Sequence, residues 1–299
     1  MTASTPSLAA PTYEKSTWHW RGHSICYATL GEGPPLVLIH GFGASIDHWR
    51  KNIPVLAASG YRVYALDLLG FGGSDKPVQD YALESWVELL RDFWEAHIQE
   101  PAVWIGNSIG ALMALMVMAE HPAIARAGVL LNAAGGLNHR PEELNLPLRL
   151  FMGAFSRAIS TPVIGQFLFD RIRQKSRLRS TLKQVYCDRD AITDDLVDII
   201  YQPTCDPNAP KVFAAIITAP SGPSPADLLP QIHQPLLVLW GEADPWTPIS
   251  GAKIYQTLAQ QEPERVQFYP IPQTGHCPHD EHPDQVNPKI LDWLSTILR

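Results

Sequence analysis

The chain has 299 residues and a mass of 33.2 kDa, which is enough for one large α/β domain or two ordinary domains and for a core that needs no disulfide or metal. Hydrophobic residues make up 45% of it and charged residues 18%, which excludes a disordered, collagen-like or coiled-coil protein. The formal net charge of −7 argues against a general nucleic-acid-binding protein, because neutralising phosphates requires a basic surface.

The N-terminus and the cysteines bear on where the protein is found. Residues 1–13 contain no charged region followed by an apolar run, so they predict neither a secretory signal nor an anchor. The longest apolar run, residues 109–119, is shorter than the roughly 20 residues that span a bilayer. Four widely separated cysteines fit no CxxC metal or redox pattern: Cys26, Cys187, Cys205 and Cys277. We therefore expect a soluble cytoplasmic protein, with peripheral membrane contact left open.

Runs of β-branched and aliphatic residues alternate with segments of helical spacing, which is typical of a mostly parallel sheet flanked by helices. The chain opens instead with a predicted hairpin that turns at Gly22. The predicted strands cover residues 18–21, 24–29, 36–40, 62–66, 102–106, 128–132, 235–240 and 266–269. The predicted helices cover residues 47–58, 83–97, 109–120 and 284–298.

The middle of the chain follows a different pattern. Residues 137–233 read as helices interrupted by prolines, with no convincing central strand. We therefore expect a helical cap inserted after the sixth strand of the sheet. The expected division is a first part of the α/β core at residues 1–136, the cap at 137–233 and the second part of the core at 234–299.

A candidate nucleophile lies between a predicted strand and a predicted helix, in the G-x-S-x-G sequence of residues 106–110. A serine on such a tight strand-to-helix turn has a strained backbone, and the turn presents its hydroxyl to a pocket at the positive end of the helix. Side chains at Gly106 or Gly110 would collide with the neighbouring strand and helix. The alternative is an ordinary Gly-Ser turn, but the flanking strand and helix favour Ser108 as a nucleophile.

A serine nucleophile needs a base, and the base needs a carboxylate that orients it. Asp244 follows the predicted strand 235–240 directly, and His276 follows the strand 266–269 after a loop rich in proline and glycine. The chain order serine, acid, histidine is that of α/β-hydrolases. Two alternatives stay open: Glu242 could replace Asp244 as the acid, and His276 could be an ordinary surface histidine.

The same chemistry requires donors for the negative oxygen of a tetrahedral intermediate. The sequence His40-Gly41-Phe42-Gly43 ends the predicted strand 36–40, where this architecture places a donor loop. We assign the backbone N–H groups of Phe42 and Ile109 to this oxyanion hole. The alternative is a glycine-rich turn that binds no ligand.

Two charged segments could suggest other functions. Three histidines and two carboxylates lie within residues 276–282, but their spacing matches no zinc signature and two prolines would scatter the ligands, so we expect no bound metal. A basic stretch in the cap is either a solvated helix face or a contact with an anionic membrane surface: Arg171, Arg173, Lys175, Arg177, Arg179 and Lys183.

These motifs resemble the α/β-hydrolase superfamily over nearly the whole chain, and five segments are similar more specifically to the chlorophyll dephytylases and, more loosely, to pheophytinases. The five segments are residues 106–110, 130–136, 220–225, 239–244 and 275–280. The resemblance implies cleavage of the phytyl ester of chlorophyll to chlorophyllide and phytol, without a cofactor and in association with thylakoid membranes. Plant members carry a transit peptide, for which this N-terminus is too short, and a cyanobacterial protein would fit better.

Other functions on the same scaffold remain open. A carboxylesterase or a carbon–carbon bond hydrolase could use the same three residues, whereas a serine at position 108 disfavours epoxide hydrolases and haloalkane dehalogenases, which need a carboxylate nucleophile there. A non-enzymatic pigment-binding module is the alternative from another class, because a fold does not fix a function. The sequence leaves undecided the choice between chlorophyll and pheophytin, the opening of the cap and the oligomeric state.

Overall fold

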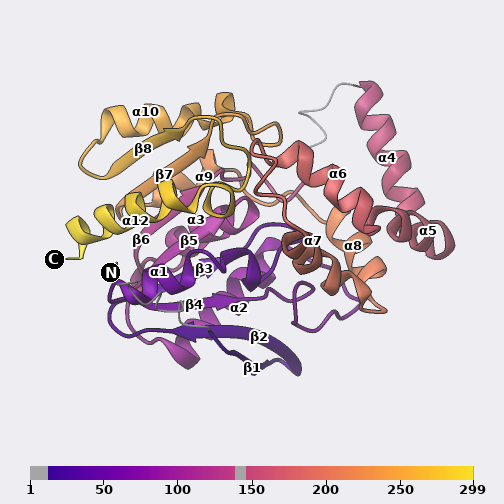
Figure 1. The fold of residues 1–299 in the computed structure, drawn as a ribbon, viewed down its shortest axis with the longest axis horizontal. Helices are drawn as coiled ribbons and strands as arrows, with labels where there is room; N and C mark the ends of the chain where they lie inside the picture. Colours follow the sequence, from indigo (N-terminus) through magenta and orange to yellow (C-terminus); the bar gives the residue numbers. More distant parts are fainter. Residues whose placement is uncertain (1–12, 139–145, 299) are drawn as a thin grey trace, which may run out of the picture.

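The computed structural model describes residues 13–138 and 146–298. Eight strands form one sheet in the order β1-β2-β4-β3-β5-β6-β7-β8 (Figure 1). The β1–β2 and β2–β4 pairs are antiparallel and the other pairs are parallel, which confirms the predicted mostly parallel sheet. The strands are β1 (Lys15–Trp20), β2 (His23–Leu30), β3 (Pro35–Ile39), β4 (Arg62–Leu66), β5 (Ala102–Asn107), β6 (Ala125–Leu131), β7 (Leu236–Gly241) and β8 (Val266–Ile271).

Helices cover both faces of this sheet, and a further group lies between β6 and β7 in the sequence. The helices around the sheet are α1 (Ile53–Ala58), α2 (Leu83–His97), α3 (Ile109–Glu120), α10 (Lys253–Gln261), α11 (Pro278–Glu281) and α12 (Pro283–Ile297). Those between β6 and β7 are α4 (Leu146–Ser160), α5 (Pro162–Ile172), α6 (Lys175–Val185), α7 (Asp194–Tyr201), α8 (Ala209–Ile217) and α9 (Pro225–Leu228).

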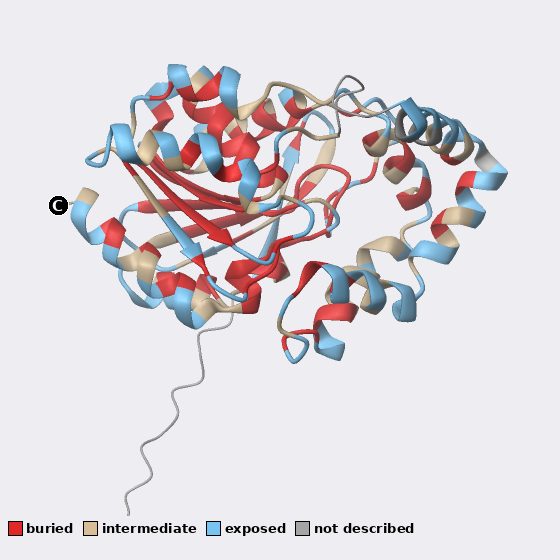
Figure 2. Cartoon of the chain, turned by 90° about the horizontal axis from the view of Figure 1, so that it is seen from above, coloured by how far each residue is buried: buried red, intermediate tan, exposed pale blue. Residues whose placement is uncertain are grey.

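The sheet is buried on both faces because successive side chains of a strand point to opposite sides. In β3, Val37 and Ile39 pack in a cluster with α2 and α3, whereas Leu36 and Leu38 pack with α1 and α12. Figure 2 shows the buried strands between the two layers of helices. Strands buried on both faces have continuous apolar sequences, which is why they could be predicted from the sequence.

The helices α4 to α8 form a cap that lies beyond the edge of the sheet, with α4 and α5 farthest from it (Figure 1). The last part of the predicted cap segment packs on the core instead of on the cap, since Leu228, Leu229 and Ile232 belong to the hydrophobic cluster that contains α3. Within residues 13–138 and 146–298, no helix combines the length and the apolar character needed to cross a membrane.

Two local predictions need correction, and proline explains both. The predicted helix 47–58 is wrong in its first half, where a short 3₁₀ turn, Ile46–Trp49, precedes α1. Pro54 has no N–H and fits only the first turn of a helix, so α1 begins beside it. The strand β8 continues past the predicted end at 269, because Pro270 is tolerated on a strand at the edge of the sheet.

The helix α3 and the strand β3 approach each other closely at Gly110. A Cβ atom at this position would lie 2.2 Å from the carbonyl oxygen of Ile39 and 2.7 Å from that of His40. Since backbone atoms cannot give way as a flexible side chain can, only glycine fits between α3 and β3 here.

We predict that Gly110→Ala lowers the free energy of unfolding by about 1–3 kcal/mol or more, through overpacking. The matched control is Gly153→Ala on α4, where an added Cβ would meet no atom within 4 Å and where alanine should stabilise the helix by up to about 1 kcal/mol. Urea unfolding of both variants measures the difference, and equal stabilities would contradict the close packing of α3 on β3.

Candidate active site

Ser108 lies between β5 and α3 in a strained conformation, with φ +57° and ψ −120°. Positive φ is costly for a residue with a side chain and is maintained only where surrounding structure enforces it. Gly106 allows the chain to turn this tightly, because a Cβ atom there would lie 2.2 Å from the backbone of Gly110. The turn therefore has the strained strand-to-helix geometry that its sequence predicts.

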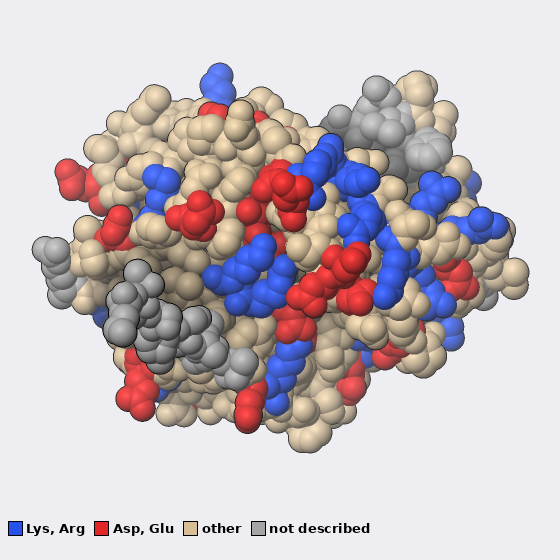
Figure 3. All heavy atoms as spheres, in the orientation of Figure 1, with Lys and Arg blue, Asp and Glu red and all other residues tan. Residues whose placement is uncertain are grey.

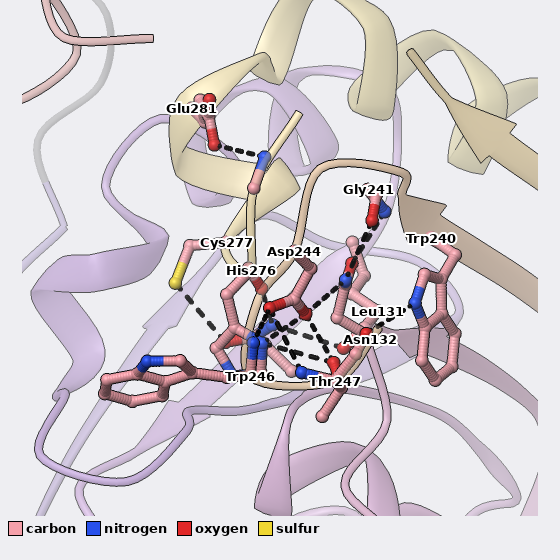
Figure 4. Close-up of polar contacts among 12 residues, drawn as sticks. Leu131, Asn132, Trp240, Gly241, Asp244, Trp246, Thr247, His276, Cys277 and Glu281 are labelled. Carbon is pink, nitrogen blue, oxygen red and sulfur yellow. Dashed lines mark hydrogen bonds and ion pairs between the residues drawn. The ribbon is translucent and has the colours of Figure 1, made fainter. Parts of the chain in front are cut away.

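His276 and Asp244 form a buried pair beside this turn. The Nδ1 atom of His276 lies 2.6 Å from Oδ2 of Asp244, and each residue is only 4% exposed (Figure 4). Because an ionised carboxylate can only accept hydrogen bonds, the proton is on Nδ1 and Nε2 keeps a lone pair. Glu242 is exposed, so the carboxylate brought to His276 is that of Asp244.

Asp244 is held by several further donors from its own loop. The backbone N–H groups of Trp246 and Thr247 donate to Oδ1 at 2.7 and 3.1 Å, and the Thr247 hydroxyl donates to Oδ2. Burial raises the pKa of Asp244, but the hydrogen bonds from His276 and Thr247 outweigh it and hold that pKa below its usual value. The carboxylate therefore stays ionised at neutral pH.

Asn132 also holds Asp244, a role that the sequence analysis missed. Its Nδ2 group donates to Oδ2 of Asp244 at 2.7 Å, and its Oδ1 atom accepts from the N–H of Gly241 at 2.9 Å (Figure 4). Asn132 follows β6 directly and has a φ of +44°. A polar residue that follows a buried strand at the carboxyl edge of a parallel sheet was the available signal.

The predicted oxyanion loop lies against Ser108. A Cβ atom at Gly41 would lie 3.3 Å from Cβ of Ser108. His40 fixes this loop: its Nε2 atom accepts from Leu68 N–H at 3.1 Å, so Nδ1 carries the proton and donates to the carbonyl of Gly41 at 2.8 Å. Burial lowers the pKa of His40 and keeps the ring neutral.

The two predicted oxyanion donors belong to two different segments, the loop after β3 and the start of α3. Phe42 lines the same cavity as Ser108. Ile109 is the first residue of α3, and N–H groups in the first turn of a helix have no acceptor within that helix. Both positions agree with the predicted donor roles, which remain a proposal.

The loop that carries His276 is held by the core and by the cap. Asn107 donates to the backbone oxygen of His276 at 2.9 Å, and the N–H of His276 donates to the carbonyl of Val185 at the end of α6, also at 2.9 Å. The buried carboxylate of Glu281 accepts from Gly275 N–H at 2.8 Å and from Asp188 N–H at 2.6 Å. A displacement of α6 would therefore disturb the histidine loop.

Two of the residues that follow His276, His279 and Asp280, belong to another buried network. Asp280 pairs with Arg50 at 2.8 Å and accepts from the Tyr186 hydroxyl at 2.8 Å. Since that hydroxyl donates to Asp280, it accepts from Nε2 of His48 at 2.7 Å, and the ring of His279 packs on that of His48 with centroids 4.7 Å apart. Across the described ranges, no three His, Cys, Asp or Glu side chains are arranged to hold a metal ion.

Ser108 and His276 open on one cavity of about 360 Å³ between the core and the cap. Its charged lining residues are Lys76 and Arg173. Trp246, which is 50% exposed, lines the cavity beside the ring of His276, with the two ring centroids 5.7 Å apart. Most of the remaining lining is apolar and includes Phe42, Phe71, Phe169, Ile172, Leu178, Leu182, Ile200, Val212, Phe213 and Ile216.

Comparison with known proteins gives the class. A model of the alpha/beta hydrolase family matches residues 36–289, so the chain belongs to this family. It is 29% identical to the chloroplastic pheophytinase of Arabidopsis thaliana over 88% of this chain and 61% of that protein, and thus spans less than two thirds of its length. It is also 29% identical to a 2-hydroxy-6-oxo-6-(2'-aminophenyl)hexa-2,4-dienoic acid hydrolase of Metapseudomonas resinovorans, over 90% and 87%.

The fold agrees with that assignment. The crystal structure of a serine hydrolase involved in carbazole degradation superposes with a TM-score of 0.75 and 26% identity, covering 96% of this chain and all of the other. The predicted α/β-hydrolase fold and the resemblance to pheophytinases are thus confirmed.

We predict that Asn132→Ala lowers kcat on any ester substrate by about 10–100-fold with little change in KM, because a buried charged acceptor loses a donor worth about 1.5–3 kcal/mol. The control is Asn138→Ala, since Asn138 donates to the backbone carbonyls of Ile216 and Ala219 rather than to Asp244. Steady-state kinetics with melting temperatures measures both variants. An unchanged kcat in a folded Asn132→Ala protein would refute the positioning role.

The buried network predicts a loss of stability in acid. Burial lowers the pKa of His48 to about 4 from its usual 6.5, so between these pH values the unfolded chain binds a proton that the folded chain does not. Stability therefore falls as the pH drops from about 6.5 to about 4, by up to about 3 kcal/mol from this group. Urea unfolding should show a shallower pH dependence in His48→Gln than in the wild type. The same slope in both proteins would refute the assignment.

Proposed function

We propose that this protein is a serine hydrolase that cleaves the phytyl ester of chlorophyll, releasing chlorophyllide and phytol. The observation that carries the proposal is that a strained Ser108 and the buried His276–Asp244 pair open together on one apolar cavity. The similarity to pheophytinase over 88% of the chain supports a phytylated pigment as the substrate.

The first half of the reaction forms an acyl-enzyme. Nε2 of His276 takes the proton of Ser108 as Oγ attacks the ester carbonyl, whose π electrons move to the oxygen. The N–H groups of Phe42 and Ile109 donate to that oxygen, and removing one such donor typically costs about 10²–10³ in rate. The intermediate then collapses: the C–O bond to the alcohol breaks, and His276 gives its proton to the departing phytol.

The second half releases the acid. Water gives a proton to His276 and attacks the acyl carbon of the chlorophyllide ester of Ser108. As the new tetrahedral intermediate collapses, its C–O bond to Ser108 breaks and His276 gives the proton to Oγ. Asp244 keeps the proton of His276 on Nδ1 in both halves and stabilises the imidazolium. No cofactor takes part in this scheme.

The cavity suits the proposed substrate. A lining that is mostly aliphatic and aromatic favours a long isoprenoid alcohol over a polar one. We place the macrocycle at the mouth, where Trp246 lines the cavity and is half exposed, since a flat ring can stack on an indole. Because such a pigment resides in membranes, the proposal includes peripheral contact of a cytoplasmic protein with thylakoid membranes.

A carbon–carbon bond hydrolase is the second candidate function. The chain is as similar to the dienoic acid hydrolase as to pheophytinase, at 29% identity. The cavity lining also contains Lys76 and Arg173, which could pair with the carboxylate of a smaller substrate.

The test compares purified protein with its Ser108→Ala variant on detergent-dispersed chlorophyll a, pheophytin a, a short nitrophenyl ester and a dienoic acid, with products separated by chromatography. We expect chlorophyllide release by the wild type and a loss of about 10⁴-fold or more in the variant. His279→Gln serves as a control for the neighbouring histidine, whose ring packs on Trp49 and does not line the cavity.

Other outcomes contradict specific parts of the proposal. Turnover of the nitrophenyl ester alone would retire the chlorophyll assignment and keep the serine hydrolase. Turnover of the dienoic acid alone would favour the second candidate. Chlorophyllide release by Ser108→Ala would exclude Ser108 as the nucleophile, and pigment binding without any turnover would favour a binding module.

A further inference from the structure

The outer surface of the cap carries an unusual number of exposed apolar side chains. Eleven large hydrophobic side chains are exposed in the described ranges, and six of them lie on α4 and α5. We call these six the outer cap face: Leu146 (59% exposed), Leu150 (65%), Val163 (80%), Ile164 (47%), Phe167 (57%) and Ile172 (39%). Water-facing helices do not normally collect apolar residues in this way, so the face is expected to contact something apolar.

The charge around the outer cap face is opposite to that of the whole chain. Residues 146–185 contain eight of the 23 Lys and Arg residues but only one of the 30 Asp and Glu residues. Arg157, Arg171 and Arg177 are exposed, and the guanidinium of Arg171 lies over the ring of Phe167, 5.1 Å from its centroid. Figure 3 shows Lys and Arg side chains gathering over the cap. An apolar face edged by cations complements an anionic lipid surface.

The apolar face, rather than the basic stretch alone, is the part of the cap suited to such a lipid surface. Three cations of that stretch pair with aspartates, and so part of its charge is neutralised within the cap. The pairs are Arg173 with Asp170 at 2.7 Å, Lys175 with Asp198 and Arg179 with Asp194.

The outer cap face and the cavity share the helix α5. On α5, Val163 and Phe167 are exposed, whereas the buried Phe169 lines the cavity. Ile172, at the end of the same helix, both lines the cavity and remains 39% exposed. A surface that holds α5 would therefore lie next to the chamber that contains Ser108.

We propose that the outer cap face docks on the surface of an anionic lipid bilayer, with α4 and α5 lying in the interface and their apolar side chains inserted below the headgroups. Such helices bind by buried apolar area together with attraction between basic side chains and anionic lipids. The inference deepens the membrane contact included in the proposed function by assigning it to a surface. It does not rest on the identity of the substrate, because any membrane-soluble ester would reach the cavity in the same way.

A second copy of the chain fits the same face less well. In a symmetric dimer, the same surface of both subunits would meet. That arrangement would bring together two surfaces that each carry Arg157, Arg171 and Arg177, and like charges oppose association. A bilayer with anionic headgroups has no such conflict.

The experiment is vesicle flotation with the full chain and no pigment. The vesicles are phosphatidylcholine alone or phosphatidylcholine containing phosphatidylglycerol. The test variant is Val163→Ser with Phe167→Ser, neither of which lines the cavity. The matched control is Val55→Ser with Val78→Ser. These two valines lie outside the cap and are 40% and 58% exposed. Melting temperatures establish that each protein is folded, and sedimentation velocity gives the oligomeric state.

We expect the wild type to bind the anionic vesicles more tightly than the neutral ones. The test variant should bind both kinds about tenfold or more weakly, because it loses apolar area that would be buried. The control should bind like the wild type. Arg157→Gln with Arg177→Gln should weaken binding to anionic vesicles alone and reduce its dependence on salt.

Three results would overturn the proposal. The first is no binding of the wild type to either kind of vesicle. The second is equal binding by the wild type and a folded test variant. The third is a wild-type dimer that becomes a monomer in the test variant, which would show that a second copy covers the face. None depends on chlorophyll turnover, so failure here is distinct from failure of the pigment proposal.

Discussion

The hydrogen bond between His276 and Asp244 is the contact on which the proposed chemistry depends. At 2.6 Å and in a buried setting, it fixes the proton on Nδ1 and leaves Nε2 free to act as a base. Asn132 and Thr247 hold Asp244 in place by donating to its carboxylate, and the hydrogen bonds from His276 and Thr247 keep its pKa below the usual value. Ser108 follows β5, Asn132 follows β6, Asp244 follows β7 and His276 follows β8. Four neighbouring parallel strands therefore bring the whole set to one edge of the sheet.

The cap contributes to the same site from outside the sheet. Its α6 end accepts a hydrogen bond from the backbone of His276, and Tyr186, just beyond it, connects Asp280 and His48 in a buried network. The far side of the cap is apolar and exposed on α4 and α5. One group of helices thus lines the cavity and supports the histidine loop, and under our proposal it also docks on a bilayer.

Much of this arrangement could be predicted from the sequence, because its signals are local. The glycines around Ser108 and the apolar run of β3 can each be recognised from a few consecutive residues. Gly110 packs against the backbone of β3, as the G-x-S-x-G motif predicts. The sequence favoured Asp244 over Glu242 only through its placement after a strand, since the choice depends on which carboxylate the loop after β7 turns inward. The support from Asn132 and the pairing of the basic stretch depend on contacts between distant segments, and one sequence does not show them.

The most direct test of the central claim is the reaction of the protein with a fluorophosphonate, followed by mass spectrometry of the intact chain and its peptides. The reagent reports on an activated serine without assuming a substrate. We predict one added phosphonyl group per chain, located on Ser108, with labelling slowed by about 10²-fold or more in Asp244→Asn, which favours the wrong tautomer of His276. Labelling at another residue, or equally fast labelling of a folded Asp244→Asn protein, would contradict the claim that Ser108 is activated through His276 and Asp244.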